Sequence, residues 1–500
     1  MPQSNGSNHF DALRLRLVKP QAQSLQAPRE YSKRAQAHRQ IIQGVILAFF
    51  LLWTMTACIS VPASPITTHL SEPSPISTTT PSATTTPTQP AKPEPTIQPS
   101  HTLTSTSLPS PTTEPTQQPT IHPTQRSENH RFPDSEIVYS PNAADFDVIA
   151  YLDTTTGFLR EYRQYLMITG WISGGEIVEL VALENSINPR LLLALLEFHC
   201  GCVLTTPDAP DTIEPWLGAE EYYRHDLYGQ LIWAVHQLSD AYYGWQTGTL
   251  TYLSSPNGTI VDISPETNAG TVALQNVFFN RFSTPNELEN TLSAFLTTYQ
   301  MMFGDPFSYE VTLIPEGLTQ PTFQLPFEPG KVWGMSGGPH PAFEGSGPWA
   351  SLDFAPPAVV QGCFDSPDWV TAVAEGVIVR SEFGIVVQDL DMDGVEHTGW
   401  NVMYLHIADK DRVPLGEKLS PGDRIGHPSC EGGRATGTHL HLARKYNGQW
   451  IAADGPIPFV LSGWVAHNGE IPYKGTLTHA GTVITASTSS ARSTWIQIDE

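Results

Sequence analysis

The stretch "GTHLHLAR", which ends at Arg444, contains two histidines two residues apart, His439 and His441. The run alternates like a β-strand, in which residues i and i+2 project from the same face, roughly 6.6 Å apart along the chain. Both imidazoles are therefore expected to face one surface. If that surface is a cleft, one ring can bind a metal while the other acts as a base nearby. A solvated strand face would carry the same pair, so other residues must decide between these readings.

Two further segments supply residues of the same chemical kind. Upstream, "GGPHPAFEGSGPWASLDF" contains His340 in a Gly/Pro-rich stretch and Asp353 in a short strand-like run. Between the two segments, "NVMYLHI" places His406 on the face that Tyr404 is expected to share. Each residue alone has an ordinary structural explanation. Together they supply imidazoles and a carboxylate, enough for the open three-ligand site that catalytic zinc uses.

In this order the motifs "GGPH…SLDF", "YLH" and "GTHLHL" resemble the lysostaphin-like zinc endopeptidases that cut peptidoglycan peptides, and within that family the β-lytic branch. The resemblance covers the chain from about position 326 to 458. It implies zinc (Zn²⁺) held by His340, Asp353 and His441, with His439 and His406 as catalytic histidines that do not bind the metal. It also implies a small antiparallel β domain with an open groove.

The same resemblance implies hydrolysis of the peptide bonds of bacterial peptidoglycan by zinc-activated water. Zinc lowers the pKa of bound water to about 7, so hydroxide becomes available at neutral pH. His439 is then expected to take the proton of the water and pass it to the leaving amine. His406 is expected to hydrogen-bond the oxyanion of the tetrahedral intermediate.

Composition excludes one class of partner. The chain of 500 residues has 50 acidic and 26 basic residues, which gives a formal net charge of -24. This charge has the wrong sign for holding nucleic acid phosphates. No nucleic acid partner is expected, and peptidoglycan is the expected one.

The N-terminal segment predicts export. A basic region precedes "IIQGVILAFFLLWTMTAC", an apolar run about as long as a signal-peptide core that ends at Cys58. The residues "MTAC" resemble a bacterial lipobox, in which Cys58 would carry the lipid. Residues 1–58 are therefore expected to be a signal peptide and lipoprotein anchor, with an uncleaved transmembrane anchor as the alternative. Either anchor places the folded part at the extracellular face of the membrane, in the cell envelope.

Three segments follow the anchor, so the expected fold class is multidomain. Residues 59–132 are rich in Ser, Thr and Pro and predict a disordered linker. Residues 133–310 contain apolar helical patterns, including "GGEIVELVALENSINPRLLLALLEFHCG" and "YGQLIWAVHQLSDAYYGW", and predict a compact helical domain. Residues 320–485 contain short alternating runs such as "TAVAEGVIVRSEFGIVVQDL" and predict the antiparallel β-rich zinc peptidase domain.

The segment "NSINPRLLLALLEFHCG" resembles the active-site helix of the soluble lytic transglycosylases and goose-type lysozymes. In those enzymes the apolar run leads into a catalytic Glu, whereas His199 stands at that position here. Glu197 is the nearby acid, but two residues along a helix rotate a side chain by about 200°. The resemblance therefore implies a lysozyme-like fold without the catalytic Glu, expected to bind wall glycan or position the peptidase.

Two other functions stay open at this point. The chain can be a non-catalytic wall-binding or regulatory lipoprotein, or a glycan-cleaving enzyme that works through its helical domain. The intact set of five residues argues against the first of these.

The cysteines and one acidic run give two further expectations, about disulfide pairing and about a turn. Cys200 and Cys202 are too close in sequence for an easy mutual bridge, whereas a Cys363–Cys430 bridge would tie together two loops of the β domain. The run "DLDMDG", Asp389 to Gly394, has the spacing of a calcium loop but lacks the acidic twelfth residue of an EF-hand. An acidic hairpin turn is expected there.

Overall fold

The computed structural model describes residues 128–210, 213–220, 223–280, 284–343, 345–358, 360–489 and 491–498, all within one folded unit, Pro115–Glu500. The expected signal peptide with Cys58, and the expected linker up to residue 127, lie outside the described residues. In the described part of the chain, no helix combines the length and the apolar character needed to cross a membrane.

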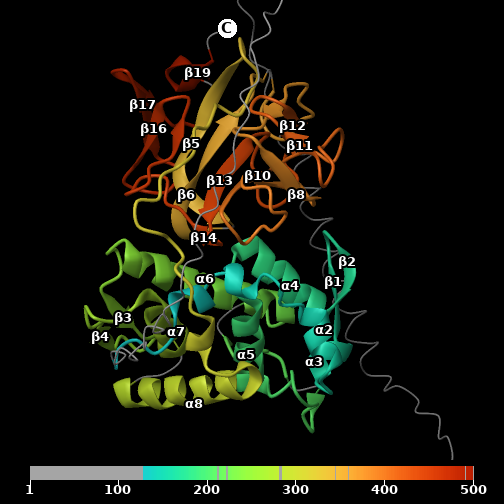
Figure 1. The fold of residues 1–500 in the computed structure, drawn as a ribbon, viewed down its shortest axis with the longest axis vertical. Helices are drawn as coiled ribbons and strands as arrows, with labels where there is room; N and C mark the ends of the chain where they lie inside the picture. Colours follow the sequence, from blue (N-terminus) through green and yellow to red (C-terminus); the bar gives the residue numbers. More distant parts are fainter. Residues whose placement is uncertain are drawn as a thin grey trace, which may run out of the picture. The chain divides into compact units, whose positions relative to one another are not determined.

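The first half of the described chain is mainly helical (Figure 1). The helical runs predicted from the sequence are confirmed as α4, α5 and α6. Two short hairpins, which the sequence patterns did not indicate, interrupt the helices. The elements are η1 (Asp134–Glu136), η2 (Pro141–Ala143), α2 (Val148–Asp153), α3 (Phe158–Glu161), β1 (Arg163–Leu166), β2 (Gly170–Ser173), α4 (Gly174–Asn185), α5 (Pro189–Cys200), α6 (Leu227–Gln246), β3 (Tyr252–Ser254), β4 (Ile260–Asp262), α7 (Ala269–Phe279), α8 (Pro285–Phe303) and η4 (Pro306–Tyr309).

Local sequence explains where α4 and α5 begin and end. Ser173 and Glu176 form a reciprocal capping box at the start of α4. Ser186 ends this helix with a left-handed backbone, φ 53°. Asn188 then caps the backbone N–H of Arg190, and Pro189 occupies the first position of α5. The short "NSINP" segment therefore stops one helix and starts the next.

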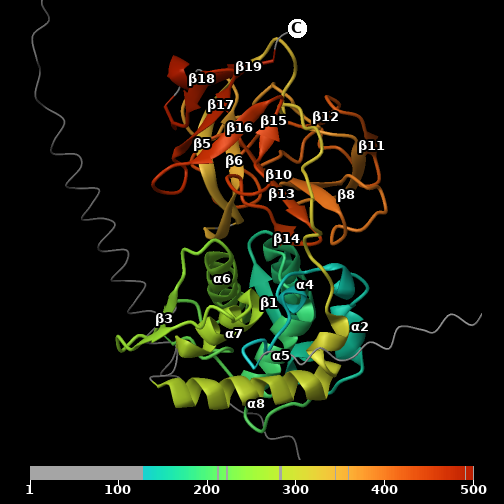
Figure 2. The same cartoon turned by 60° about the vertical axis from the view of Figure 1, so that its left-hand side comes forward.

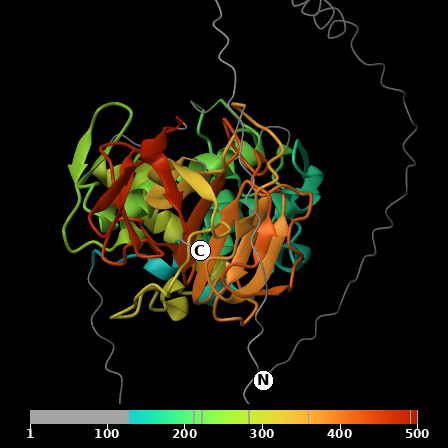
Figure 3. The same cartoon turned by 90° about the horizontal axis from the view of Figure 1, so that it is seen from above.

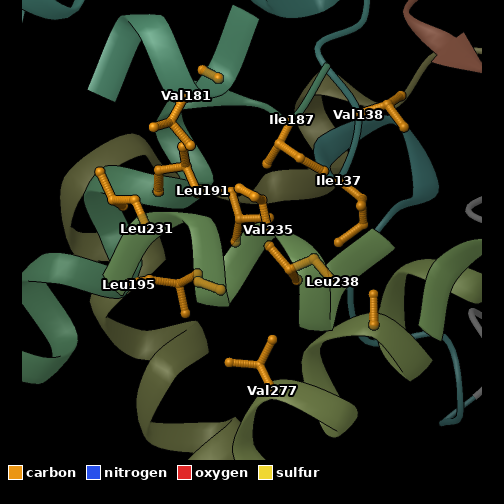
Figure 4. Close-up of a cluster of buried hydrophobic side chains, with 14 of the residues drawn as sticks. Ile137, Val138, Val181, Ile187, Leu191, Leu195, Leu231, Val235, Leu238 and Val277 are labelled. Carbon is orange, nitrogen blue, oxygen red and sulfur yellow. The ribbon is translucent and has the colours of Figure 1, made fainter. Parts of the chain in front are cut away.

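Apolar side chains from these helices form one core (Figure 4). Val181 from α4, Leu191 from α5, Leu231 and Val235 from α6 are fully buried, and Val277 from α7 is nearly so. Burying an aliphatic side chain of this size contributes about 1.5–3 kcal/mol. This core holds the helices together and extends to residues of the β-rich half of the chain.

Both pairs of cysteines are bridged in the structure. Cys200 and Cys202, which were not expected to form an easy mutual bridge, are paired with each other. Gly201, which ends α5 with φ 59°, reverses the chain so that the two Cα atoms lie 5.2 Å apart, a normal disulfide span. The expected Cys363–Cys430 bridge is confirmed and joins residues 67 positions apart.

The second half of the described chain is a β-rich region built around a nine-stranded sheet. Its main path runs β11-β8-β9-β10-β13-β6-β5-β19, with β14 paired to β13, and its pairings are antiparallel. The strands are β5 (Val332–Phe343), β6 (Ser346–Ala355), β8 (Gly376–Glu382), β9 (Ile385–Asp389), β10 (Trp400–Leu405), β11 (Lys418–Leu419), β13 (Leu440–Tyr446), β14 (Gln449–Trp450) and β19 (Trp495–Gln497).

Smaller sheets flank the large one. Strands β7 (Val370–Thr371) and β12 (Arg424–Gly426) form one pair. Strands β15 (Val460–Leu461), β16 (Trp464–Asn468), β17 (Gly475–His479) and β18 (Thr482–Thr485) form a four-stranded sheet that contacts β5, followed by η5 (Arg492–Thr494). The view from above shows this sheet in red beside the strands of the large sheet (Figure 3).

Alternation along the central strands divides the large sheet into two faces. Val402 and Tyr404 of β10 and Leu442 of β13 point into the core of the β region. Met403 and Ala443, on the opposite face, belong to the core shared with the helices. The helical region therefore packs against part of one face of the sheet. In Figure 2, α4 and α6 lie below β13 and β14.

Hydrogen bonds fix the contact between the two regions. The Trp450 backbone N–H of β14 donates to the Tyr243 hydroxyl of α6, at 3.1 Å. The Ser186 hydroxyl donates to the backbone oxygen of Gly448, at 2.6 Å. Since these groups are largely buried, each unmade bond would cost about 1–3 kcal/mol. The helical region and the sheet are therefore held in one arrangement.

We predict that the Cys363–Cys430 bridge stabilises the chain substantially. Replacing both residues with Ala should lower the free energy of unfolding by about 2–5 kcal/mol, because a long loop is freed in the unfolded chain. Denaturant unfolding measures this. Replacing Cys200 and Cys202 with Ala should cost less, since that bridge closes only a very short loop. Equal losses for the two double variants would contradict the prediction.

Candidate metal centre

Three neighbouring strands bring three polar side chains to one point. His340 lies on β5, Asp353 on β6 and His441 on β13. Asp353 and His441 are directly opposite each other in the strand register. Gly337 also lies opposite Asp353, and a Cβ atom at this position would sit 2.4 Å from Asp353 Oδ2. The glycine is therefore needed for the carboxylate to occupy its place.

The ligand-type atoms of these residues are close together. His340 Nε2 and His441 Nδ1 lie 3.0 Å apart. Asp353 Oδ1 lies 3.2 Å from His340 Nε2 and 3.3 Å from His441 Nδ1. The exposed fractions of the three residues are only 1, 6 and 6 %. These residues form the metal-ligand-type cluster that we call the His-Asp-His cluster.

Carbonyl partners determine which ring nitrogens carry protons. His340 Nδ1 lies 2.8 Å from the Gly338 oxygen, and His441 Nε2 lies 2.9 Å from the Ala342 oxygen. A carbonyl oxygen can only accept, so these nitrogens donate. In neutral imidazoles the opposite nitrogens then carry lone pairs, and both face the Asp353 carboxylate. Three acceptor groups in contact repel one another unless a cation lies among them, so the cluster fits a metal.

The electrostatics of the cluster agree with this reading. Burial raises the pKa of Asp353, but its interactions with His340, His439 and His441 hold that pKa well below its usual value. Burial lowers the pKa of His441, mainly because the charged ring would lose its hydration. The carboxylate is therefore ionised and His441 neutral at neutral pH, as metal ligation requires.

His439 stands beside the cluster, just before β13. Its Nε2 lies 3.7 Å from Asp353 Oδ1, and its Nδ1 lies 2.8 Å from the Gly437 oxygen. Nδ1 therefore donates to that carbonyl, and Nε2 of the neutral ring presents a lone pair toward the cluster. The structure thus places both histidines of the His-Leu-His triplet on one side, as the strand alternation predicts.

His406 follows β10 and turns toward the same site. Its ring centre lies 4.5 Å from that of His439, and its Nδ1 lies 2.8 Å from the Glu431 oxygen. Burial, with the charges of His439 and His441, lowers the pKa of His406 to about 3.

The expectation that His406 shares a face with Tyr404 is wrong. His406 has a left-handed backbone, φ 67°, which ends the strand alternation. The Tyr404 hydroxyl instead donates to Gln388 and accepts from the Val373 N–H in the β core.

Tyr473 is a residue of the site that sequence reasoning missed. Its ring stacks on His340 with centres 4.0 Å apart, and its backbone N–H donates to the Pro339 oxygen. Burial and the charge of Asp353 raise the pKa of Tyr473, so the hydroxyl stays protonated. Tyr473 lies in the turn between β16 and β17, far from the three motifs, and no local pattern marks it.

The expected acidic hairpin turn is confirmed between β9 and β10. Asp389 accepts hydrogen bonds from the backbone N–H groups of Asp391 and Gly394. These bonds order the turn, which lies at the opposite end of β10 from His406.

The fold and the cluster together define a β-rich domain with a candidate metal centre. Comparison with known proteins agrees. Residues 130–316 match the family described as "LasA, N-terminal domain". Over 344 residues the chain is 28% identical to Protease LasA of Pseudomonas aeruginosa (strain UCBPP-PA14). The aligned region covers 64% of this chain and 75% of that protein.

Two other matches cover a smaller share of the chain. The chain is 30% identical over 151 residues to the beta-lytic metalloendopeptidase of Achromobacter lyticus, covering 28% of this chain and 36% of that protein. Among solved structures, the M23 metalloprotease pseudoalterin is 24% identical, with a TM-score of 0.29, and covers 34% of this chain and 96% of that one.

The chain is thus homologous to Protease LasA and to the beta-lytic metalloendopeptidase, which supports the resemblance seen in the motifs. The match of the helical region is to the LasA N-terminal domain. The likeness of this region to lytic transglycosylases and goose-type lysozymes stays a prediction.

We predict that His340→Ala, Asp353→Ala and His441→Ala each remove bound metal, because a three-ligand site that loses one ligand keeps too little affinity. Metal content of the purified variants, measured after dialysis, checks this. His467→Ala is the matched control: His467 lies on β16 with its Nε2 2.8 Å from the Thr478 hydroxyl, and its loss should leave the metal content unchanged. Full occupancy in one of the first three variants would remove that residue from the ligand set.

Proposed function

We propose that this chain is an exported zinc endopeptidase that hydrolyses peptide bonds of bacterial peptidoglycan. The observation that carries the proposal is the convergence of three acceptor groups at the buried His-Asp-His cluster, with two further histidines beside it. Homology supports it, because the relatives include a protease and a metalloendopeptidase. The N-terminal segment supports export and attachment to the membrane through a lipid or an apolar anchor.

We assign the metal site to His340 Nε2, Asp353 and His441 Nδ1. Two imidazole nitrogens and one carboxylate are a ligand set of catalytic zinc, and they leave one position open. A bound Zn²⁺ would polarise the substrate carbonyl and acidify a water molecule. The carbonyl partners of the two imidazoles hold the rings in the orientation that ligation needs.

We assign the proton transfers to His439. Its Nε2 presents a lone pair beside the cluster, so it can take a proton from the attacking water. The same nitrogen can then give that proton to the leaving amine, which completes the hydrolysis.

His406 and Tyr473 would supply the remaining polar contacts, which are those to the attacking water, to His439 and to the oxyanion. A low pKa keeps His406 neutral, and its Nδ1 donates to Glu431, so the other nitrogen offers a lone pair. We therefore propose that this nitrogen of His406 accepts a hydrogen bond from the attacking water or from protonated His439, and so orients it. The Tyr473 hydroxyl stays protonated, and we assign to it the hydrogen bond to the oxyanion that the motifs alone gave to His406.

The glycan-cleaving alternative has less support. A glycosidic bond needs a carboxylic acid to protonate the leaving oxygen. Glu197 uses its Oε2 to accept the backbone N–H groups of Val203 and Leu204, at 2.9 and 3.0 Å, so it holds the loop after α5. His199 lines a cavity together with Glu214 and Glu220. Analysis of the reaction products tests whether this cavity cleaves glycan.

The products released from purified peptidoglycan distinguish the three functions. We expect the zinc-loaded chain to release new amino groups and peptide fragments of matching mass, and Asp353→Asn to release none. Release of reducing or anhydro sugar ends without new amino groups would establish the glycan-cleaving alternative. Sedimentation with the wall but no release of either kind would establish a binding protein.

We predict that His439→Ala retains zinc but loses about 10²- to 10⁴-fold of the hydrolytic rate, the usual contribution of general acid-base catalysis. His406→Ala should also retain zinc and lose rate. Rates on purified peptidoglycan and metal content are measured on the same samples, with His467→Ala as the control. Hydrolysis at the parent rate by either variant would contradict its catalytic role.

A further inference from the structure

A cavity of about 400 Å³ lies at the outer end of β5 and β6. Its walls come from β5, the end of β6, the segment after β18 and the start of β19. Gly334 of β5 is paired with Ala355 of β6 and with Trp495 of β19, so three strands meet there. No part of the proposed catalytic apparatus lines this cavity.

The cavity lies on the same face of the sheet as the His-Asp-His cluster. Trp333 and Met335 point into the β core, so Gly334 and Ser336 between them face the other way. Phe354 also points into that core, so its neighbours Asp353 and Ala355 share the opposite face. Ala355, which lines the cavity, therefore lies one same-face step from Asp353, roughly 6.6 Å along the strand.

The other side of the cluster is closed. Along β13, His441 is followed on the same face by Ala443, which is fully buried against the helical region. Met403 of β10, paired with Ala443, is covered in the same way. The helical region therefore covers this face on the side of β10 and β13, and none of its described residues lines the cavity.

The lining defines the chemistry of an occupant. Val332, Pro356 and Pro357 supply apolar wall, and the half-exposed Trp495 supplies an aromatic face. Thr488 and Ser489 supply hydroxyl groups at the rim. Among the described residues that line the cavity, none carries a charge. The guanidinium of Arg492 lies 5.5 Å from the centre of the Trp495 ring, outside the lining, whereas the walls themselves let an apolar side chain gain from burial.

One polar atom of the wall lacks a partner. The Ser336 hydroxyl oxygen is buried, and it makes no hydrogen bond to any group in the described part of the chain. A buried hydroxyl without a partner is costly, and such groups are rare in folded proteins. The backbone amide of a bound peptide would satisfy this hydroxyl.

We propose that this cavity is a substrate subsite that binds an uncharged, apolar residue of the wall peptide next to the scissile bond. The proposal rests on the peptidase function proposed above. The peptide would run over the His-Asp-His cluster, with its apolar side chain between the proline wall and Trp495 and a backbone amide at Ser336. The cavity thereby selects which peptide bond reaches the metal.

The test uses fluorescence-quenched octapeptides based on glycine, with Leu or Glu placed at each position in turn. The zinc-loaded full chain should prefer Leu over Glu by about tenfold or more at one position adjacent to the cleaved bond, identified by product mass. Thr488→Lys introduces a cation at the rim of the cavity. This variant should shift the Leu/Glu ratio of kcat/KM toward Glu by about three- to tenfold at that position only, through a partly screened ion pair.

The matched control is Thr485→Lys, an exposed substitution on β18 outside the cavity lining, which should keep the parent ratio. Equal ratios in the parent and in Thr488→Lys, with the all-glycine peptide still hydrolysed by the parent and the control, would overturn the subsite and leave the peptidase function standing. Failure of the parent to hydrolyse any peptide of the set would overturn both.

Discussion

The candidate metal centre is defined by three buried acceptor groups that are held close together although they repel one another. His340 Nε2, His441 Nδ1 and the Asp353 carboxylate lie 3.0–3.3 Å apart with little access to water. Their outer hydrogen bonds, to carbonyl oxygens, orient the lone pairs inward. Such an arrangement is stable when a cation sits at its centre, and strand pairing of β5, β6 and β13 gives it no freedom to relax.

The remaining features position this cluster and control access to it. The helical region covers the sheet face on one side, through Met403 and Ala443, and is fixed there by the hydrogen bond that the Trp450 N–H of β14 donates to the Tyr243 hydroxyl of α6. The Cys363–Cys430 bridge ends next to Glu431, whose carbonyl orients His406. The fold therefore provides a side covered by helices and an anchored histidine loop beside the cluster.

Local patterns predicted the elements and the residues with ligand chemistry, since a strand fixes which neighbours share a face. His439 and His441 could be placed together for this reason. His406 could not be oriented, because its positive φ is set by the chain after β10 and not by alternation. Tyr473 and the Cys200–Cys202 bridge depend on how a turn and a glycine fold back, which short-range patterns do not record. The choice of the sheet face that the helices cover likewise depends on tertiary packing, which local sequence patterns do not indicate.

Anomalous diffraction at the zinc absorption edge, on crystals of the full chain grown with zinc, tests the central claim most directly. The account predicts one strong peak within about 2.0–2.2 Å of His340 Nε2, His441 Nδ1 and an Asp353 oxygen. His439 and His406 should lie near the peak without bonding to it. No peak among these three atoms, or a peak bonded to His406 and His439 instead, would contradict the account.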